Sequence, residues 1–305
     1  MLTKFEGIFS IVISPFTEDG KDVDFEDLRN VVDILISEGV NGLALPGVGS
    51  EFYKLADAER TQMIETVVAQ ANNQVPVIAN ITRNATSLAV QDAREAEAIG
   101  VDGIMIVPPW FIPPTNQEIL EHVNAVADSV DLPVIIQYAP NVTGVSIPVK
   151  TFLDIAAART QDIYIKAELV PPGEMISSII EQTKGEMGVF TGNGCVQMYD
   201  LLERGAMGHM PGSSMARPYI EIYQAYVNGD KEKAFDLFNK FLPVLNLVTQ
   251  SAEMFIQFEK TILKARGVIK SDHCRAPHAE VSSYNQILNR YDQYMKAHFG
   301  YGLLS

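Results

Sequence analysis

Residues 163–168 read Ile163-Tyr164-Ile165-Lys166-Ala167-Glu168, and this stretch decides both the fold and the function that we predict. Its β-branched and aromatic residues predict a short buried strand. Lysine is rarely buried without a partner, and an apolar surround lowers the pKa of an amine, which frees it to attack a carbonyl carbon. Side chains two positions apart share one face of a strand, so Lys166 and Glu168 should point the same way. This pattern fits a Schiff-base site with its own acid/base, and it fits a structural Lys–Glu pair equally well.

Seven further apolar runs resemble this one, at intervals of roughly thirty residues, and amphipathic helical stretches separate them. The predicted strands are Gly7–Ser14, Gly42–Pro46, Val75–Ile81, Gly103–Val107, Val134–Tyr138, Ile163–Glu168, Gly188–Thr191 and Ala206–Met210. Alternating β and α units give a parallel sheet, and eight units predict an α/β fold, the closed (β/α)8 or TIM barrel. A doubly wound sheet would require a glycine-rich fingerprint after the first strand, and the turn Ser14–Thr17 has none.

The helices predicted between the strands have recognisable ends. Asp24 and Asp57 are typical N-caps, and Gly39 and Gly100 are typical helix stops. These helices are Asp24–Glu38, Asp57–Asn72, Ser87–Ile99, Gln117–Ser129, Val149–Arg159, Glu174–Gln182 and Met198–Arg204. After Ala216–Asn228, three helical segments follow with no strand between them, namely Asp230–Asn246, Ala252–Ala265 and Glu280–Ala297. We therefore predict a barrel over residues 1–229 and a C-terminal helical extension over residues 230–305.

Length and charge limit the classes of partner. The chain has 305 residues, a formal net charge of −15 and a pI of about 4.7, which argues against nucleic acid and anionic membranes as partners. A small anionic substrate needs only a local cluster of donors and stays possible. The apolar runs are shorter than a membrane span, and Glu6 interrupts the N-terminal one. Cys195 and Cys274 form no CxxC motif or disulfide framework, so we expect a cytoplasmic protein.

In such barrels the active site lies at the C-terminal ends of the strands. These ends are rich in glycine, hydroxyl and amide groups and include one lysine: Ser14–Thr17, Gly47–Glu51, Asn80–Arg83, Pro108–Trp110, Gln137–Pro140, Lys166–Glu168, Gly192–Gly194 and Pro211–Ser214. No pair of histidines has metal-ligand spacing, so we expect neither a metal nor another cofactor. His209 is expected to be structural, and the spacing of His273, Cys274 and His278 gives little support to a metal site.

Four segments together resemble the dihydrodipicolinate synthase / N-acetylneuraminate lyase family: Ser14–Thr17, Gly47–Glu51, Pro133–Pro140 and Ile165-Lys166. The resemblance runs from about Phe5 to about Arg275. It implies a class I lyase on a (β/α)8 barrel with C-terminal helices, assembled as a homo-oligomer, commonly a tetramer. It also implies that Lys166 is the Schiff-base lysine and that a turn formed by Gly47, Val48, Gly49 and Ser50 binds the carboxylate of a keto acid. Backbone N–H groups of a glycine-rich turn suit an anion.

Two departures from the family pattern are informative. Gln137 stands where most members carry a tyrosine that relays protons, and Tyr138 is one residue out of register and should face the helices. Val142 stands where the synthase has an arginine that binds the aldehyde substrate's carboxylate. These losses argue against the synthase reaction of the lysine pathway. Ser50, or a water held by Gln137, could take over the relay.

A narrower subset fits the motifs better. Four segments resemble L-2-keto-3-deoxyarabonate dehydratase and a related deaminase, namely Gly47–Glu51, Gln137–Pro140, Ile165–Glu168 and Gly205–Gly212. The resemblance implies that Glu168 acts as acid/base. Lys166 would attack the C2 ketone of a 2-keto-3-deoxy acid, and Glu168 would remove a C3 proton and assist loss of the C4 hydroxyl. Gln137 is the third catalytic candidate.

Other predicted substrate-binding residues lie at the remaining strand ends. They are Trp110, Asn193, Pro211 and Gly212. Trp110 stands where relatives carry an aromatic that reaches a neighbouring subunit, although a hydrophobic pocket wall explains it as well. Two alternatives to the dehydratase remain open. One is a pyruvate-using retro-aldol lyase or synthase, and the other is a catalytically silent ligand-binding protein.

Overall fold

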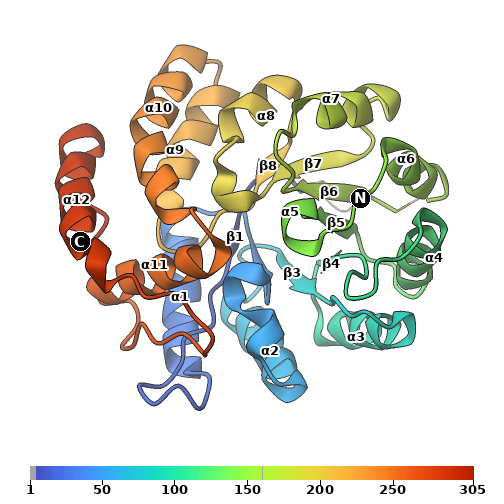
Figure 1. The fold of residues 1–305 in the computed structure, drawn as a ribbon, viewed down its shortest axis with the longest axis horizontal. Coiled ribbons are helices and arrows are strands. Elements are labelled where there is room, and N and C mark those ends of the chain that lie inside the picture. Colours follow the sequence, from blue (N-terminus) through green and yellow to red (C-terminus); the bar gives the residue numbers. More distant parts are fainter. Residues whose placement is uncertain (1–4, 160) are drawn as a thin grey trace. The chain divides into compact units, whose positions relative to one another are not determined.

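The computed structural model describes residues 5–159 and 161–305. Strands within these ranges hydrogen-bond in sequence order into a closed parallel barrel (Figure 1). They are β1 (Gly7–Ile11), β2 (Gly42–Leu45), β3 (Val77–Asn80), β4 (Gly103–Ile106), β5 (Val134–Tyr138), β6 (Ile163–Ala167), β7 (Gly188–Thr191) and β8 (Gly208–His209). The predicted (β/α)8 TIM barrel is confirmed. Several strands are shorter than predicted. The apolar residues at 12–13, for example, are buried in the core but lie beyond the end of β1.

Helices follow the strands, and three lie in the C-terminal region where the sequence predicts an extension. They are α1 (Phe25–Glu38), α2 (Asp57–Ala71), α3 (Thr86–Ile99), α4 (Asn116–Ala127), α5 (Pro140–Thr143), α6 (Val149–Ala157), α7 (Gly173–Gln182), α8 (Met198–Arg204), α9 (Ala216–Val227), α10 (Lys231–Val248), α11 (Ala252–Ala265) and α12 (Asn285–Phe299). Short 3-10 turns are η1 (Val48–Ser50), η2 (Phe52–Lys54), η3 (Asn193–Cys195) and η4 (Ser282–Tyr284). Among the described helices, none combines the length and the apolar character needed to span a bilayer.

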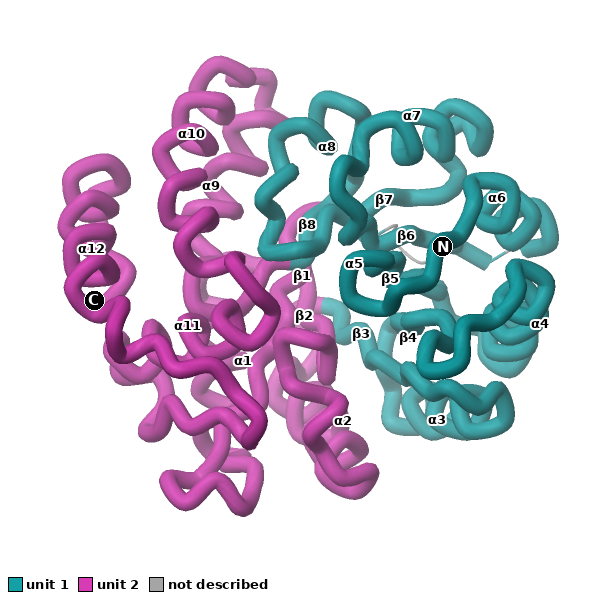
Figure 2. The backbone as a smooth tube through the Cα atoms, in the orientation of Figure 1, with its two compact units in different colours: residues 1–6, 76–210 teal, residues 7–75, 211–305 magenta. Residues whose placement is uncertain are grey.

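The chain divides into two compact units, which Figure 2 distinguishes by colour. Unit one comprises residues 1–6 and 76–210 and carries β3–β8 with α3–α8. Unit two comprises residues 7–75 and 211–305 and carries β1, β2, α1, α2 and α9–α12. The predicted boundary between residues 229 and 230 falls between the end of α9 at Val227 and the start of α10 at Lys231, and it stays a prediction.

Most of the predicted helix ends are confirmed. The carboxylate of Asp24 accepts hydrogen bonds from the backbone N–H groups of Glu26 and Asp27 and so caps α1. Gly39 and Gly100 end α1 and α3 with φ angles of 94° and 96°, the left-handed conformation that glycine adopts without a steric penalty. The prediction for Asp57 is wrong. Ala56 is the N-cap of α2, and Asp57 is the first helical residue.

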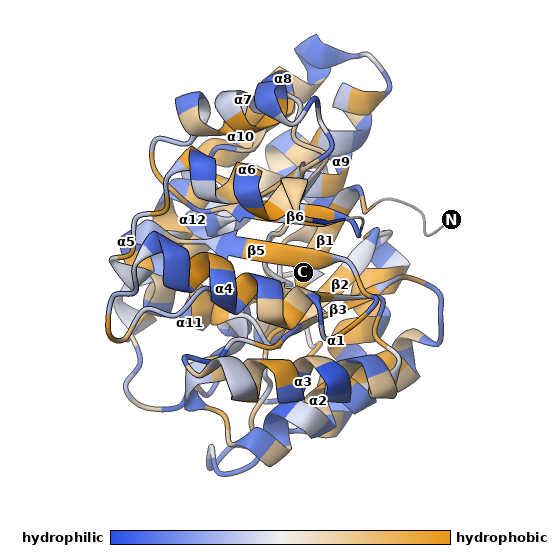
Figure 3. Ribbon diagram, turned by 90° about the vertical axis from the view of Figure 1, so that its right-hand side faces the viewer, coloured by the Kyte–Doolittle hydropathy of each residue, from blue (hydrophilic) through white to orange (hydrophobic). Residues whose placement is uncertain are grey.

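The register of β5 and β6 determines which side chains face the barrel interior. Gln137 pairs with Lys166, and Tyr138 pairs with Ala167. The Tyr138 ring meets Phe152 of α6 at a centroid distance of 5.4 Å, and its hydroxyl accepts a hydrogen bond from the backbone N–H of residue 147. Tyr138 therefore faces the helices, as the alternation predicts, and Gln137 shares the face of Lys166. Figure 3 shows β5 as hydrophobic along most of its length with a hydrophilic end.

Aromatic side chains fill the same face of β6 on the N-terminal side of the lysine. The Tyr164 ring stacks on Phe5 at 5.6 Å and meets Phe190 edge-on at 5.7 Å. The Tyr164 hydroxyl accepts a hydrogen bond of 3.0 Å from the Phe5 N–H. Phe190 is the register partner of Lys166 on β7. The rings of Phe5, Tyr164 and Phe190 therefore form an apolar floor beneath Lys166. Lys166 itself is only 3% exposed.

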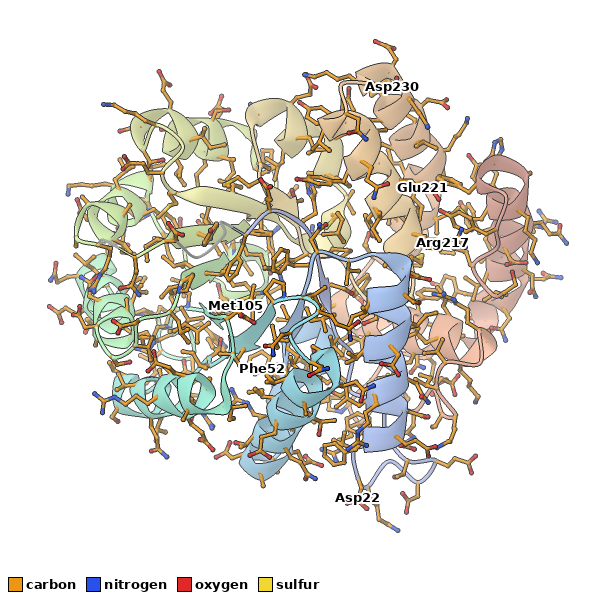
Figure 4. The ribbon with its side chains drawn as sticks, turned by 180° about the vertical axis from the view of Figure 1, so that it is seen from behind. Asp22, Phe52, Met105, Arg217, Glu221 and Asp230 are labelled. Atoms are coloured by element: carbon orange, nitrogen blue, oxygen red, sulfur yellow. The ribbon has the colours of Figure 1, made fainter. Side chains whose placement is uncertain are left out.

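The last residues of the chain dock onto α9 in unit two. Arg217 and Glu221, labelled in Figure 4, lie one turn apart on this helix. The Arg217 guanidinium carbon lies 4.0 Å from the centre of the Tyr301 ring, a cation–π distance. Burial, and after it the charge of Glu221, raises the pKa of the Tyr301 hydroxyl. This contact holds the C-terminal segment against the helix.

Helix α11 buries two consecutive residues with ionisable side chains, Glu259 and Lys260, among mostly apolar residues. Ser251 caps the helix, because its hydroxyl accepts a hydrogen bond of 3.2 Å from the Met254 N–H. Burial raises the pKa of the Glu259 carboxyl to about 7, although hydrogen bonds from residues 213 and 214 and the charge of Arg266 oppose the shift. A carboxyl with a raised pKa stabilises the fold while it is protonated.

A first prediction concerns this carboxyl and pH. The unfolded chain releases the Glu259 proton near its ordinary pKa of 4.5 and the folded chain near 7, so the fold should lose stability as pH rises between these values. Glu259→Gln keeps the shape without the titration. We expect the variant to exceed the natural chain in free energy of unfolding by about 1–3 kcal/mol at about pH 8 and by much less at about pH 5. Urea unfolding at both pH values measures this difference.

A surface carboxylate on the neighbouring helix provides the control. Asp236 of α10 is 61% exposed and pairs with Lys240. Asp236→Asn should therefore change stability equally at the two pH values. If the effect of Glu259→Gln is also independent of pH, the Glu259 carboxyl is already ionised in the folded chain at about pH 5.

Candidate active site

The centre of the candidate site is the ion pair that the strand pattern predicts. The Lys166 ammonium nitrogen lies 3.0 Å from Glu168 Oε1, and the two side chains are 4% and 13% exposed. Lys166 belongs to β6, and Glu168 is the first residue beyond it. The Glu168 N–H donates to the Tyr138 carbonyl at 2.9 Å, so the strand geometry continues to the carboxylate and keeps both side chains on one face. The backbone of β6 thus places the amine and the carboxylate on the same face.

Further groups fix the carboxylate of Glu168. The Gln137 amide nitrogen donates to Oε2 at 2.7 Å, and the Asn193 backbone N–H donates to Oε1 at 3.2 Å. Burial raises the pKa of Glu168, but the charge of Lys166 and the bonds from Gln137 and Asn193 outweigh it, and the pKa falls below its ordinary value of 4.5. The carboxylate is therefore ionised at neutral pH and can accept a proton.

The turn after β7 is shaped around this carboxylate. A Cβ atom on Gly192 would lie 2.3 Å from Glu168 Cγ, so only glycine fits there. Asn193, Gly194 and Cys195 follow with φ angles of 51°, 60° and 57°. Left-handed conformation costs a residue with a side chain roughly 1–2 kcal/mol, and such strain collects at functional sites. The strained turn aims the Asn193 N–H at Glu168, while the Asn193 side chain is exposed.

The two polar atoms of the Gln137 side-chain amide differ in their hydrogen bonding. Its nitrogen is committed to Glu168, whereas its buried Oε1 has no hydrogen-bond partner among residues 5–159 and 161–305. A buried acceptor without a donor carries a penalty of about 1–3 kcal/mol, which a ligand donor or a water would remove. An amide has no proton to relay at neutral pH. Gln137 can therefore orient Glu168 and accept a hydrogen bond from a ligand, but it cannot replace a tyrosine as a proton carrier.

In unit two, the turn Gly47–Glu51 follows β2 and forms η1. The Ser50 hydroxyl donates to the Val12 carbonyl at 2.5 Å and accepts from the Gly47 N–H at 3.0 Å. The Ser14 hydroxyl donates to the Ser50 carbonyl at 2.5 Å. Both functions of the Ser50 hydroxyl are thus used to hold the turn against the end of β1, and a fully buried hydroxyl so engaged is poorly suited to the proton relay that we considered for it.

The last residue of this turn is a buried carboxylate in a strained conformation. Glu51 has φ of 56° and is fully buried. Its Oε1 lies 2.5 Å from Lys260 Nζ, and its Oε2 lies 3.1 Å from Lys54 Nζ and accepts from the Arg275 N–H at 3.2 Å. Phe52, labelled in Figure 4, then leads toward α2. The charge of Glu51 is therefore used inside the protein and not on a substrate.

The segment after β8 is also tied to β1 in unit two. The Ile11 N–H donates to the Pro211 carbonyl at 2.7 Å, and the Ser10 hydroxyl donates to the Gly212 carbonyl at 3.0 Å. Glu259 accepts from the Ser214 N–H at 2.7 Å and from the Ser214 hydroxyl at 2.9 Å. A Cβ atom on Gly212 would lie 2.3 Å from Glu259 Cδ. The predicted roles of Pro211 and Gly212 in substrate binding stay predictions.

Trp110 lies in the segment after β4 in unit one. Asn84 Oδ1 accepts hydrogen bonds from the backbone N–H groups of Trp110 and Phe111, at 3.0 Å and 3.2 Å. Trp110 is half-buried, while Phe111 and Ile112 are 83% and 79% exposed. The predicted role of Trp110, as pocket wall or subunit contact, stays a prediction.

The structure groups the predicted residues by unit. Unit one brings together Lys166, Glu168, Gln137 and the backbone of Asn193, and unit two brings Gly47–Ser50 and Pro211–Gly212 to the same end of β1. Sequence reasoning missed Glu259 and Lys260, which hold both segments of unit two. A signal for them was present, since consecutive charges interrupt the apolar face of the predicted helix Ala252–Ala265.

Comparison with known sequences bears on these groups. Residues 4–295 match the model of the dihydrodipicolinate synthetase family. The 4-hydroxy-tetrahydrodipicolinate synthase of Methanospirillum hungatei JF-1 is 30% identical over 294 residues, which cover 94% of this chain and 100% of that protein. The corresponding enzyme of Methanopyrus kandleri is 30% identical over 243 residues, 79% of this chain and 80% of that one.

Solved structures agree with the sequence matches. Dihydrodipicolinate synthase from Aquifex aeolicus has a TM-score of 0.87 and 27% identity, covering 97% of this chain and 98% of that one. The chloride-inhibited enzyme from Acinetobacter baumannii in complex with pyruvate has a TM-score of 0.86 and 25% identity, covering 96% and 98%. A family match over nearly all of the chain, with the same barrel, shows that the chain belongs to the dihydrodipicolinate synthetase family.

Proposed function

We propose that this protein is a class I lyase in which Lys166 forms a Schiff base with a 2-keto acid. The observation that carries the proposal is the Lys166–Glu168 pair, with 3.0 Å between amine and carboxylate on an apolar floor. Transfer of a proton from the ammonium to Glu168 frees the amine, which attacks the C2 ketone to form a carbinolamine. Glu168 returns the proton to the carbinolamine hydroxyl, which leaves as water, so that an iminium forms and Glu168 is a carboxylate again. The iminium acidifies the C3 protons, and Glu168 is the base within reach.

The comparisons favour one reaction over the others. The relatives are named synthases, and the Acinetobacter baumannii structure is described as a complex with pyruvate. We therefore put first a pyruvate-using lyase or synthase that makes or breaks a carbon–carbon bond at C3. This order corrects the sequence analysis, in which dehydration came first.

Dehydration of a 2-keto-3-deoxy acid, or the related deamination, remains a second candidate because of one observation. Glu168 is held by Gln137, and no phenol shares their face at this register position, since Tyr138 points toward α6. A carboxylate can take the C3 proton and return it to a leaving hydroxyl at C4. Gln137 Oε1, which has no hydrogen-bond partner among the described residues, would accept a hydrogen bond from such a hydroxyl.

The second prediction tests the nucleophile. Borohydride reduction in the presence of pyruvate should attach the three-carbon unit covalently to Lys166, because the iminium is reduced to a stable amine. Peptide mass spectrometry identifies the labelled residue, and Lys166→Ala should remove the label. Lys150, exposed on α6, should stay unlabelled. A natural chain that remains unlabelled where a known class I aldolase is labelled contradicts the Schiff base.

The third prediction separates the roles of the pair. Glu168→Gln keeps the shape and removes the base, so the borohydride adduct should still form while turnover falls roughly 10²- to 10⁴-fold. Glu174→Gln, which changes an exposed carboxylate on α7, is the matched control and should leave turnover unchanged. Normal turnover in Glu168→Gln would make Glu168 a structural partner only. Loss of the adduct as well would place Glu168 in iminium formation.

A substrate panel decides between the two reactions. The protein should be incubated with pyruvate plus aldehydes and with 2-keto-3-deoxy sugar acids, with assays for pyruvate consumed or released and for 2-oxoglutarate semialdehyde. Pyruvate turnover supports the carbon–carbon reaction, and formation of the semialdehyde supports dehydration. Turnover of neither, despite a Lys166 adduct, would support the ligand-binding alternative.

We further infer a homo-oligomer, as the family resemblance implies. Phe111 and Ile112 present a large apolar surface in one short segment next to Trp110. Light scattering should therefore give a mass that is a multiple of 33.6 kDa. A monomer mass at micromolar concentration would reject this inference.

A further inference from the structure

Helix α11 meets both of the unit-two segments that the sequence analysis assigns to substrate binding. It packs against η1, and the Phe255 ring lies 3.8 Å from the position of a Cβ on Gly49. Its consecutive residues Glu259 and Lys260 reach in different directions, Glu259 to Ser214 and Lys260 to Glu51. Two neighbouring side chains of one helix therefore contact two segments that are more than 150 residues apart in the sequence.

The first of the two anchors is the ion pair between Lys260 and Glu51. Both side chains are fully buried, and their charged atoms lie 2.5 Å apart. Lys260 also donates to the His273 carbonyl at 2.9 Å and lies 4.1 Å from the centre of the Phe16 ring. These contacts fix the Lys260 side chain, and its bond to Glu51 ties the left-handed residue Glu51 to α11. Because Glu51 ends the turn, its position sets the direction of the Gly47–Ser50 backbone.

Glu259 anchors the second segment, Pro211–Ser214, to α11. Its two oxygens accept from the N–H and the hydroxyl of Ser214, directly after Gly212 and Ser213. Gly212 lies so close to the carboxyl that no side chain fits between them. The Ser213 hydroxyl in turn donates to the Ile11 carbonyl at 2.7 Å. The segment is therefore fixed between α11 and the end of β1.

We propose that Lys260 and Glu259 are positioning residues for ligand binding, so that α11 sets the affinity for the substrate carboxylate by fixing Gly47–Glu51 and Pro211–Ser214. This inference rests on the proposed function and on the roles in substrate binding that the sequence analysis predicts for these two segments. Neither residue acts on the reacting atoms. Both act through the backbone of these segments, whose position must be held to within about half an ångström to bind a ligand well.

The first test uses Lys260→Met, which keeps the length of the side chain and removes its charge. The concentration of pyruvate that gives half-maximal borohydride labelling of Lys166 should rise roughly 10- to 100-fold, the loss of affinity expected when one or two hydrogen bonds are misplaced. The maximal labelling at saturating pyruvate should stay the same, because Lys166 and Glu168 are untouched. A purely structural role would lower the melting temperature without moving the half-saturating concentration.

A matched control is available on the same helix. Lys264 forms a surface ion pair with Asp272 at 2.7 Å and is 48% exposed. Lys264→Met should leave the half-saturating concentration unchanged. If Lys260→Met fails to fold because it leaves Glu51 buried without its main partner, the double variant Glu51→Leu with Lys260→Met removes both charges and should fold. It should show the same rise in half-saturating concentration.

Hydrogen–deuterium exchange of the ligand-free protein separates this inference from the proposed function. Lys260→Met should speed exchange at residues 47–51 and leave residues 211–214 protected. Glu259→Ala should do the reverse. Exchange across β6 should not change in either variant.

The outcomes are distinct. If the natural chain forms no Lys166 adduct, the proposed function fails, and the exchange data alone decide the inference. Unchanged exchange at residues 47–51 in the Lys260 variants overturns the inference. So does a half-saturating concentration within about twofold of that of the natural chain, since twofold corresponds to only ~0.4 kcal/mol.

Discussion

The ion pair of Lys166 and Glu168 is the constraint on which the candidate site depends. Two charges on an apolar floor are stable only when each is paired and the remaining hydrogen-bonding positions are filled. Lys166 pairs with Glu168 Oε1, Gln137 donates to Oε2, and the Asn193 N–H completes the set. The left-handed turn Asn193–Cys195 directs the Asn193 N–H at this carboxylate. Gly192 leaves room for the Glu168 side chain, because a Cβ atom there would collide with it.

Unit two also buries a pair of opposite charges, but there every hydrogen-bonding position that we describe is filled by the protein. Its fully buried pair, Glu51 and Lys260, is closed on both sides by protein groups, including Lys54 and the His273 carbonyl. Nothing in that arrangement is left to react. The Lys166 pair differs because the Gln137 Oε1 beside it is still without a donor among the described residues. An incomplete set of hydrogen bonds, rather than burial or charge, distinguishes the pair suited to chemistry from the pair suited to support.

The sequence predicts the features that arise from local periodicity. Buried parallel strands are continuous apolar runs, so the barrel and the shared face of Lys166 and Glu168 are found, and alternation alone places Tyr138 toward α6. Helix α5 and the 3-10 turns are too short to show periodicity. Lys260 lies 209 residues from Glu51, and no local signal joins two such charges. Asn193 contacts Glu168 through its backbone N–H. Almost every residue type has this group, so the identity of residue 193 does not predict the contact.

The position of α11 in the chain has a consequence for biosynthesis. The last of the described strands ends at His209, whereas Glu259 and Lys260 are synthesised about fifty residues later. Strand pairing can therefore precede anchoring of the two unit-two segments by about fifty residues of translation, some 2–10 seconds at ordinary elongation rates. During that interval, the Glu51 carboxylate lacks Lys260, one of the two lysines that pair with it. A nascent chain can thus pass through a stage in which the strands are complete and the segments Gly47–Glu51 and Pro211–Ser214 are not yet anchored.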